Sequence, residues 1–168
     1  MGRLQAFFIF AFTVIFSTHA LGAERILQIL HVNDLHSFWE SNEVDDGGGL
    51  ARVKTILDKL EAEGDAKGWV TIKLDAGDFS GGHINFLSER GVPTFKIEHA
   101  FNFDAIALGN HDYLTGLDDL ASRFTDSEQR LPLVAANFDT FRNVGVRPGL
   151  IINRGGLKNC DRRSYFKI

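Results

Sequence analysis

The chain has 168 residues, of which 44% are hydrophobic and 24% charged, a balance typical of one globular domain. Its formal net charge of −4 at pH 7 argues against binding to nucleic acid or to an anionic membrane, because both partners require a basic patch. The single cysteine, Cys160, excludes a disulfide within the chain.

The N-terminus has the order of features that a secretory signal peptide requires. Arg3 supplies a positive start, the apolar run AFFIFAFTVIF occupies residues 6–16, and small residues follow up to Ala23. The run is shorter than the ~20 apolar residues that span a bilayer, which favours a cleaved signal over an uncleaved membrane anchor. We predict a signal peptide at residues 1–23, with cleavage after Ala23 or after Ala20. The protein is then exported, periplasmic or extracellular, with no stable membrane anchor.

The segment after the signal peptide predicts a strand, a helix and a second strand. ILQILHV, at residues 26–32, is nearly continuous in apolar residues, as expected of a strand covered on both faces. From Leu50 onward, apolar residues recur every three or four positions, which predicts an amphipathic helix that Gly64 ends. WVTIKLD, at residues 69–75, is rich in β-branched residues and predicts the next strand.

The alternation continues to the end of the chain. AGDFSGG leads into a weaker helical region through Lys96 and His99. The segments that follow predict a strand at 104–108, a helix at 117–124, a strand at 131–138, and a last strand from residue 146 that enters a hairpin turn at residues 154–156. Such alternation predicts an α/β fold of βαβ units around a largely parallel sheet.

The residues with metal-ligand chemistry follow the predicted strands. Asp34 and His36 come after the first strand, Asp78 after the second, and Asn110 and His111 after the third. Ligands gather beyond the carboxyl ends of parallel strands, so these side chains are expected at one edge of the sheet. Carboxylate, amide and imidazole groups without thiolates suit zinc, manganese or iron. Each motif alone is more often a polar loop or a turn, whereas the three in order favour a metal site.

Asp78 is placed to serve two ions, because a carboxylate can bridge with its two oxygens. Two metals held ~3.5–4 Å apart orient a water, lower its pKa and clamp a phosphoryl group. The glycines beside Asp78 and Asn110 allow tight turns and leave room for a phosphate. The pattern therefore predicts a site for two divalent metal ions.

The blocks NDLH, LDAGDFSGG, DAIALGNHDYLTG and PLVAANF resemble those of the calcineurin-like metallophosphoesterases, above all the exported 5′-nucleotidase branch with its UDP-sugar hydrolases. The resemblance implies a metallophosphoesterase-type sheet with helices on both faces, here one half of a two-layered sandwich. It implies that Asp34 and His36 hold the first metal, that Asp78 bridges, and that Asn110 holds the second. His111 is then the catalytic residue, which stabilises the transition state or assists the leaving group.

The chain departs from that family pattern at three places. Leu114 stands where the branch has an aspartate that orients the catalytic histidine, and Asp112 is the nearest acidic residue. The family's later histidine ligands have no counterpart; His83 is the one spare histidine with plausible access to the site. The tail NCDRRSYFKI does not read as a buried strand. We therefore expect residues 24–158 to be the N-terminal part of a catalytic domain, and residues 159–168 an atypical tail from truncation or a frameshift.

The resemblance implies a hydrolase of phosphate monoesters, nucleotides foremost, that works by two-metal activation of water. As it stands, the chain is expected to be an incomplete and inactive fragment. Two alternatives stay open at this point: a sulfur-ester hydrolase of the same superfamily, and a secreted fragment that binds metal without catalysis. The expected partner is a small-molecule phosphate ester and not nucleic acid.

Overall fold

The computed structural model describes residues 25–42, 47–128, 130–137 and 144–154. The predicted signal peptide at residues 1–23, most of the expected hairpin turn and the tail at residues 159–168 lie outside the described residues. Among the helices in the described ranges, none is long and apolar enough to cross a membrane.

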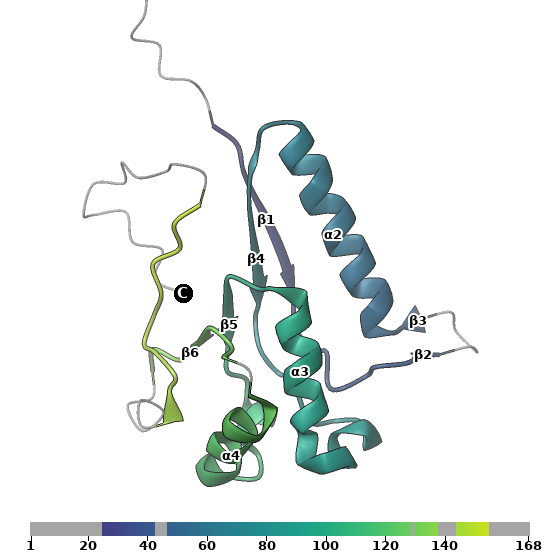
Figure 1. Ribbon diagram of the computed structural model, residues 1–168, viewed down its shortest axis with the longest axis vertical. Helices are drawn as coiled ribbons and strands as arrows, with labels where there is room; N and C mark the ends of the chain where they lie inside the picture. The colour runs from purple at the N-terminus through teal and green to yellow at the C-terminus, as the bar shows by residue number, and fades with distance from the viewer. Residues whose placement is uncertain (1–24, 43–46, 129, 138–143, 155–168) are drawn as a thin grey trace, which may run out of the picture.

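Four parallel strands form the main sheet, in the order β1-β4-β5-β6 (Figure 1). The order in the sheet is also the order in the chain, so each crossover connection moves one strand along. The parallel α/β architecture confirms the fold class predicted from the alternation of strands and helices. The strand bounds are Leu27–Val32 for β1, Val70–Asp75 for β4, Ala105–Ala107 for β5 and Leu133–Val134 for β6.

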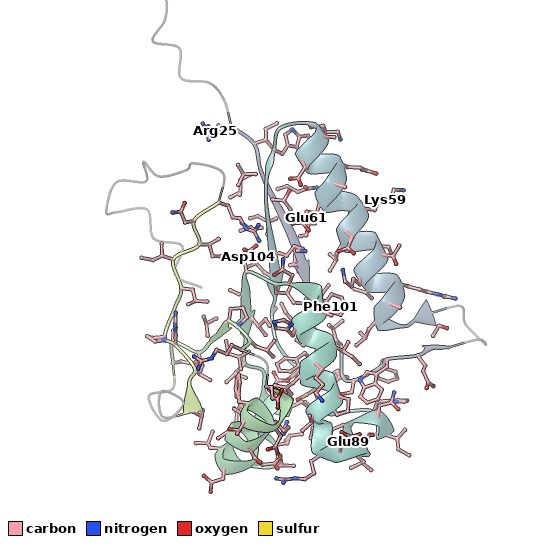
Figure 2. All side chains as sticks on the ribbon, in the orientation of Figure 1. Arg25, Lys59, Glu61, Glu89, Phe101 and Asp104 are labelled. Carbon is pink, nitrogen blue, oxygen red and sulfur yellow. The ribbon has the colours of Figure 1, made fainter. Side chains whose placement is uncertain are left out.

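The described α-helices cover one face of the sheet rather than both. Lys73 of β4 forms an ion pair with Glu61 of α2 (Nζ to Oε2, 2.6 Å), and Figure 2 shows Glu61 between helix and sheet. Right-handed crossovers that step along a sheet in one direction all pass on the same side, which explains the arrangement. The helix bounds are Leu50–Ala66 for α2, Val92–Phe101 for α3 and Leu117–Ser127 for α4.

Gly64 does not end α2 as the sequence predicts, because the helix continues to Ala66. A Cβ at position 64 would lie 2.2 Å from Gln28 Oε1 and 2.8 Å from Thr71 Oγ1. These two side chains share a hydrogen bond beneath the helix, in which Thr71 Oγ1 donates to Gln28 Oε1 (2.8 Å). Gly64 therefore permits close contact between helix and sheet, although glycine costs a helix interior about 1 kcal/mol.

The far edge of the sheet is less regular than predicted. The strand expected at residues 131–138 is reduced to the two residues of β6. The prediction of a last strand from residue 146 is wrong for the described residues, which form only an isolated parallel bridge between Arg147 and Val134. Pro148 follows at once and has no N–H with which to continue the ladder.

The hydrophobic core lies between the sheet and the helices α2, α3 and α4. Phe79 is fully buried and contacts Phe95 of α3 edge-on, with ring centroids 5.3 Å apart. Phe95 makes a similar contact with Phe124 of α4 at 5.4 Å. Ile106 of β5 and Leu120 of α4 are fully buried in the same cluster. Since Phe79 directly follows Asp78, the core anchors the loop that carries this predicted ligand.

Shorter elements complete the described chain. They are two 3₁₀ segments, η1 (Ile84–Gly91) and η2 (Asn110–Tyr113), and an antiparallel pair of β2 (Ser41–Asn42) with β3 (Gly47–Gly48).

Candidate metal centre

The loops after β1 and β4 are joined by backbone hydrogen bonds that extend the pairing of the two strands. The N–H of Asp34 donates to the carbonyl of Gly77 (3.0 Å), and the N–H of His36 donates to the carbonyl of Asp78 (2.9 Å). The first two predicted motifs are therefore held side by side at the carboxyl end of the sheet, where parallel topology requires them.

Several predicted ligand positions have left-handed backbone conformations, which side chains other than glycine rarely adopt. The φ angles are 55° at Asp34, 47° at His36 and 56° at Asp78. Such conformations cost of order 1–3 kcal/mol each, and they persist only where surrounding contacts enforce them. Here the hydrogen bonds between the two loops provide that enforcement. Strain of this kind clusters at functional sites.

The loop after β5 meets the loop after β4 at Gly109, a position that only glycine can occupy. A Cβ on Gly109 would lie 2.1 Å from Asp78 Oδ1 and 2.4 Å from the Asp78 nitrogen. The close approach lets Asp78 Oδ1 accept the backbone N–H of His111 (2.8 Å). The side chain of Asp78 thus lies between the loops that carry His36 and His111.

His36, Asp78 and His111 form the group of potential metal ligands among the described residues. One ligand atom from each lies within 4.8 Å of the others. The imidazole rings of His36 and His111 meet edge-on, with centroids 4.6 Å apart. The Nδ1 atom of each ring is buried without a hydrogen-bond partner. No hydrogen bond at these Nδ1 atoms therefore orients either ring.

This donor set fits a divalent transition metal. Two imidazole nitrogens and a carboxylate oxygen are ligands that zinc, manganese and iron accept. Coordination would also supply the orientation that the two Nδ1 atoms lack. His36 and Asp78, predicted as metal ligands, and His111, predicted as the catalytic residue, could all contact one ion.

The other two predicted ligands, Asp34 and Asn110, are more exposed. Asp34 Oδ1 is 3.4 Å from His36 Nε2, and the Asp34 side chain is more than half exposed. Its second oxygen accepts a hydrogen bond from the side chain of Asn33. Asn110 is exposed at the start of η2, directly before His111. Asp34 therefore borders the cluster of three without belonging to it, whereas the assignment of Asn110 as a ligand stays a prediction.

His83, the spare histidine, lies outside the cluster of three. Its Nδ1 accepts the backbone N–H of Asn85 (3.3 Å) at the start of η1. Its ring contacts Phe38, with centroids 4.6 Å apart. The structure thus gives His83 a capping role at η1 and an aromatic contact.

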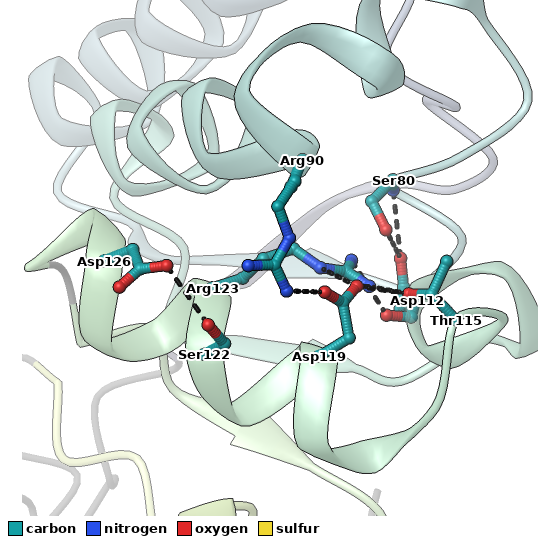
Figure 3. Close-up of polar contacts among 8 residues, drawn as sticks. All are labelled: Ser80, Arg90, Asp112, Thr115, Asp119, Ser122, Arg123 and Asp126. Carbon is teal, nitrogen blue, oxygen red and sulfur yellow. Dashed lines mark hydrogen bonds and ion pairs between the residues drawn. The ribbon is translucent and has the colours of Figure 1, made fainter.

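Asp112 joins the loops at the site, a role that the sequence did not reveal. Its fully buried carboxylate accepts N–H groups from Asp78 (3.0 Å) and Gly109 (2.8 Å) at Oδ2, and both the N–H (2.9 Å) and the hydroxyl (3.0 Å) of Ser80 at Oδ1. Figure 3 shows the contacts with Ser80. Burial raises the pKa of Asp112 to about 7, although the hydrogen bonds oppose the rise. An acidic residue among glycine-rich loops was the available signal.

No carboxylate orients His111 in the described structure. Leu114, at the position of the orienting aspartate, is 61% exposed, and both oxygens of Asp112 are occupied by the loops. The His111 ring is instead confined between the His36 ring and Gly81, where a Cβ would lie 3.3 Å from His111 Nδ1. Packing therefore holds this ring where a hydrogen bond was expected.

Arg123 of α4 forms a hydrogen bond with the backbone of η2. Its side chain is 1% exposed and donates to Asp119 Oδ2 from Nε (3.1 Å) and Nη2 (2.7 Å), and to the carbonyl of Asp112 from Nη1 (3.3 Å). Figure 3 shows Arg90 reaching the same Asp119 carboxylate from the other side. Desolvation favours a raised pKa for Asp119, but the hydrogen bonds from Thr115, Arg90 and Arg123 prevail and lower it to about 2.

Asp75 and Glu98 form a pair of buried carboxyl groups near the candidate site. Asp75 ends β4 and its Oδ1 accepts the N–H of Gly77 (2.8 Å), while Glu98 faces it from α3. Both side chains are no more than 2% exposed. Desolvation by burial, followed by the charge of Asp75, raises the pKa of Glu98 well above its usual value. Burial also raises the pKa of Asp75. The pair therefore retains a proton more readily than ordinary carboxyl groups do.

Comparison with known proteins places this geometry in context. The sequence model of the Calcineurin-like phosphoesterase family matches residues 27–167. The 5′-nucleotidase of Vibrio cholerae is 36% identical over 137 residues, which cover 79% of this chain and 24% of that protein. Protein UshA of Escherichia coli is 32% identical over 135 residues, with coverage of 79% and 24%.

A solved structure shows the same relationship. The crystal structure of a 5′-nucleotidase precursor from Thermus thermophilus superposes with a TM-score of 0.62 at 28% identity, over 77% of this chain and 26% of that one. The chain thus spans about a quarter of the length of the curated relatives it matches.

Proposed function

Because the chain belongs to the calcineurin-like phosphoesterase family, we propose that its site hydrolyses phosphate monoesters, with nucleotides as the substrate class. The observation that carries the proposal is the cluster of His36, Asp78 and His111 at the meeting point of three strand-end loops. The similarity to 5′-nucleotidases supports nucleotides over other esters. The activity is proposed for the protein to which these residues belong.

Each residue has a proposed part in the reaction. Asp34 and His36 would hold a first divalent ion, Asn110 would contribute to holding a second, and Asp78 would serve both ions. Divalent ions at such a site activate water and neutralise the charge of a phosphoryl group. His111, confined by packing beside the bridging carboxylate, donates a hydrogen bond or a proton to the phosphoryl group or to the leaving oxygen. Asp112 joins the loop after β4 to the loop after β5.

We further propose that residues 24–158 are the N-terminal part of the catalytic domain and that the protein is exported. The support for export is the order of charge, apolar run and small residues at the N-terminus. An N-terminal sequence of the secreted product that begins at Glu24 or Leu21 is expected. A product that still begins at Met1 would contradict the proposal.

A second candidate is a metal-binding chain without turnover. The observation that favours it is the compactness of the site: among the His, Cys, Asp and Glu side chains of the described residues there is one cluster of three, with Asp34 at its margin. An ion in a two-metal hydrolase needs about three or four protein ligands to stay in place. One metal per chain without hydrolysis would identify this second candidate.

The test uses the full 168-residue chain, stripped of metal and then titrated with manganese or zinc. Two ions per chain are expected for the hydrolase, while release of phosphate from adenosine 5′-monophosphate is expected of the longer protein to which these residues belong and not of this chain by itself. Asp78→Asn is expected to lower metal affinity more than Asn110→Ala does, because Asp78 serves both ions. His99→Ala, an exposed histidine of α3, is the matched control. An unchanged metal count in Asp78→Asn would refute the bridging role.

A further inference from the structure

None of the predicted metal ligands lies on α3, yet two buried polar side chains of this helix meet the loops that carry them. Thr94 and Glu98 are one turn apart and are each 1% exposed. Thr94 Oγ1 shares a hydrogen bond with the hydroxyl of Ser37 (3.1 Å), in the loop after β1. Glu98 forms a side-chain hydrogen bond with Asp75, the last residue of β4. Since residues four apart lie on one face of a helix, α3 contacts both segments with the same face.

The carboxyl groups of Asp75 and Glu98 need a hydrogen-bond donor. Asp75 Oδ1 accepts the backbone N–H of Gly77 (2.8 Å). Asp75 Oδ2 and Glu98 Oε1 are both buried, and neither accepts a hydrogen bond from an N–H or hydroxyl group. An ionised carboxylate can only accept, whereas a protonated carboxyl group can also donate. One proton held by the pair would therefore supply the donor that these buried groups lack.

The charges around the pair also favour a proton. In the described chain, the charged groups that act on it from the surrounding loops are acidic, namely Asp34, Asp78 and Asp112. Lys73, two residues before Asp75 on the same face of β4, is paired with Glu61 of α2 at 2.6 Å. Burial, followed by the charge of Asp75, raises the pKa of Glu98 well above its usual value. Retention of a proton therefore relieves the repulsion between the two buried carboxyl groups.

Gly77, which Asp75 holds, is the point where the loops of the site meet. The carbonyl of Gly77 accepts the N–H of Asp34 (3.0 Å) from the loop after β1. A Cβ at Gly77 would lie 2.6 Å from the nitrogen of Gly109, in the loop after β5. Asp78 follows Gly77 directly in the chain. A shift of the Asp75 carboxylate would therefore move the backbone at two predicted ligands, Asp34 and Asp78.

We propose that Asp75 and Glu98 share one proton, and that the resulting hydrogen bond positions the turn at Gly77 and with it the metal centre. Glu98 is then a positioning residue, one that acts on the ligands through Asp75 and Gly77. The inference rests on the proposed function and extends it to a helix outside the ligand loops. Residues that support metal ligands from outside the coordination sphere typically change metal affinity by about tenfold to a hundredfold when they are replaced.

Infrared spectroscopy of the metal-free full chain tests the shared proton. At about pH 6, above the ordinary pKa of carboxyl groups, the carbonyl band of protonated carboxyl groups is expected to lose the equivalent of one group in Glu98→Gln. Asp112, whose pKa is about 7, contributes to both spectra and cancels in their difference. Glu63→Gln, an exposed carboxyl of α2, is the matched control and should leave the band unchanged. A band that Glu98→Gln leaves unchanged would overturn the shared proton.

The manganese affinity of the full chain tests the positioning. Glu98→Gln keeps a donor, now an N–H₂ group, and is expected to bind as tightly as the wild type. Glu98→Met removes the donor at similar volume and is expected to bind about tenfold more weakly. Glu98→Asp keeps the charge but shortens the side chain by one CH₂ group. It should weaken binding in the same way, and it serves in place of Glu98→Met if that variant does not fold.

Thr71→Val is the control for a loss of stability alone. It removes the buried hydrogen bond between Thr71 and Gln28 (2.8 Å), which lies at the other end of β4 from Asp75. Urea unfolding is expected to show a less stable chain, while the manganese affinity stays that of the wild type.

The outcomes separate the carboxyl pair from the proposed function. A wild-type chain that binds no manganese but shows the infrared band that depends on Glu98 would refute the metal centre and keep the shared proton. Equal manganese affinities of the wild type, Glu98→Met and Glu98→Asp would overturn the positioning role and leave the metal centre intact. Binding by Glu98→Gln as weak as that of Glu98→Met would also overturn it, because a hydrogen-bond donor at this position would then not suffice.

Discussion

The buried carboxylate of Asp112 accepts the backbone N–H of Asp78 at 3.0 Å, and this hydrogen bond joins the loop after β5 to the loop after β4. The same carboxylate also accepts two groups of Ser80. The geometry of Asp78, on which both proposed ions depend, is therefore set by a residue that is not itself in the ligand cluster.

Replacement of Asp112 by asparagine is expected to destabilise the fold and to weaken metal binding. An amide has one acceptor oxygen, so the donors that now meet the other oxygen would face an N–H₂ group. An unsatisfied buried donor costs about 1–3 kcal/mol. Urea unfolding and a manganese titration measure the two effects. Asp126→Asn, an exposed position on α4, is the control, and equal behaviour of the two variants would refute the role of Asp112.

The stability of the metal-free chain is expected to fall as the pH rises from about 4 to about 7. Burial raises the pKa of Asp112 from 3.8 to about 7 in the folded state, so the folded state holds this proton more tightly than the unfolded state does. The contribution is complete below the unfolded pKa and is lost as the pH passes the folded pKa. The raised pKa of Glu98 acts in the same direction.

Thermal unfolding in the presence of a chelator measures this pH dependence. Asp112→Asn is expected to flatten the curve between these pH values, because its amide does not titrate. Glu98→Gln is expected to remove a separate part of the slope. A wild-type chain that becomes steadily more stable over the same interval would contradict the assignment.

Substitution of Gly82 by alanine is expected to disturb the metal cluster selectively. The new Cβ would lie 2.7–2.9 Å from ring atoms and the Cβ of His36, at a φ of +75°. Gly68 offers a matched control, since its φ is +71° but a Cβ there would have no heavy atom within 4 Å. Both variants lose about 1 kcal/mol to backbone strain. Only Gly82→Ala should lower zinc or manganese affinity, and equal affinities would refute the contact.

Replacement of Arg123 by methionine is expected to cost about 3–5 kcal/mol, because it leaves the partners of a buried charge unsatisfied. The side chain also lies over the rings of Phe86 (5.1 Å) and Phe95 (5.7 Å), so packing is lost as well. Arg90→Met removes the exposed partner of the same Asp119 carboxylate and should cost far less stability, because solvent screens an exposed ion pair. Similar midpoints of urea unfolding for the two variants would show that the burial of Arg123 does not increase its contribution to stability.

The sequence alone was sufficient for the parallel α/β architecture and for the place of the candidate site. The apolar run at residues 26–32 and the β-branched run at residues 69–75 predict strands from local composition, and both strands are present. Asp34, His36 and Asp78 directly follow them, so the topology of a parallel sheet brings these residues together. Local pattern and topology act within a few residues of each strand, which is why they can be recognised in one dimension.

Only the tertiary structure decided the contacts between distant segments. Gly64 looked like a helix stop because nothing local reveals that Gln28 and Thr71 lie beneath it. Nothing in the local sequence shows that Arg123 is buried, because its burial depends on the packing of α4. Asp112 looked like a polar loop residue until folding enclosed it among the N–H groups of two loops. Burial and the pairing of polar groups depend on which segments meet in space, and a single sequence specifies that only through the complete fold.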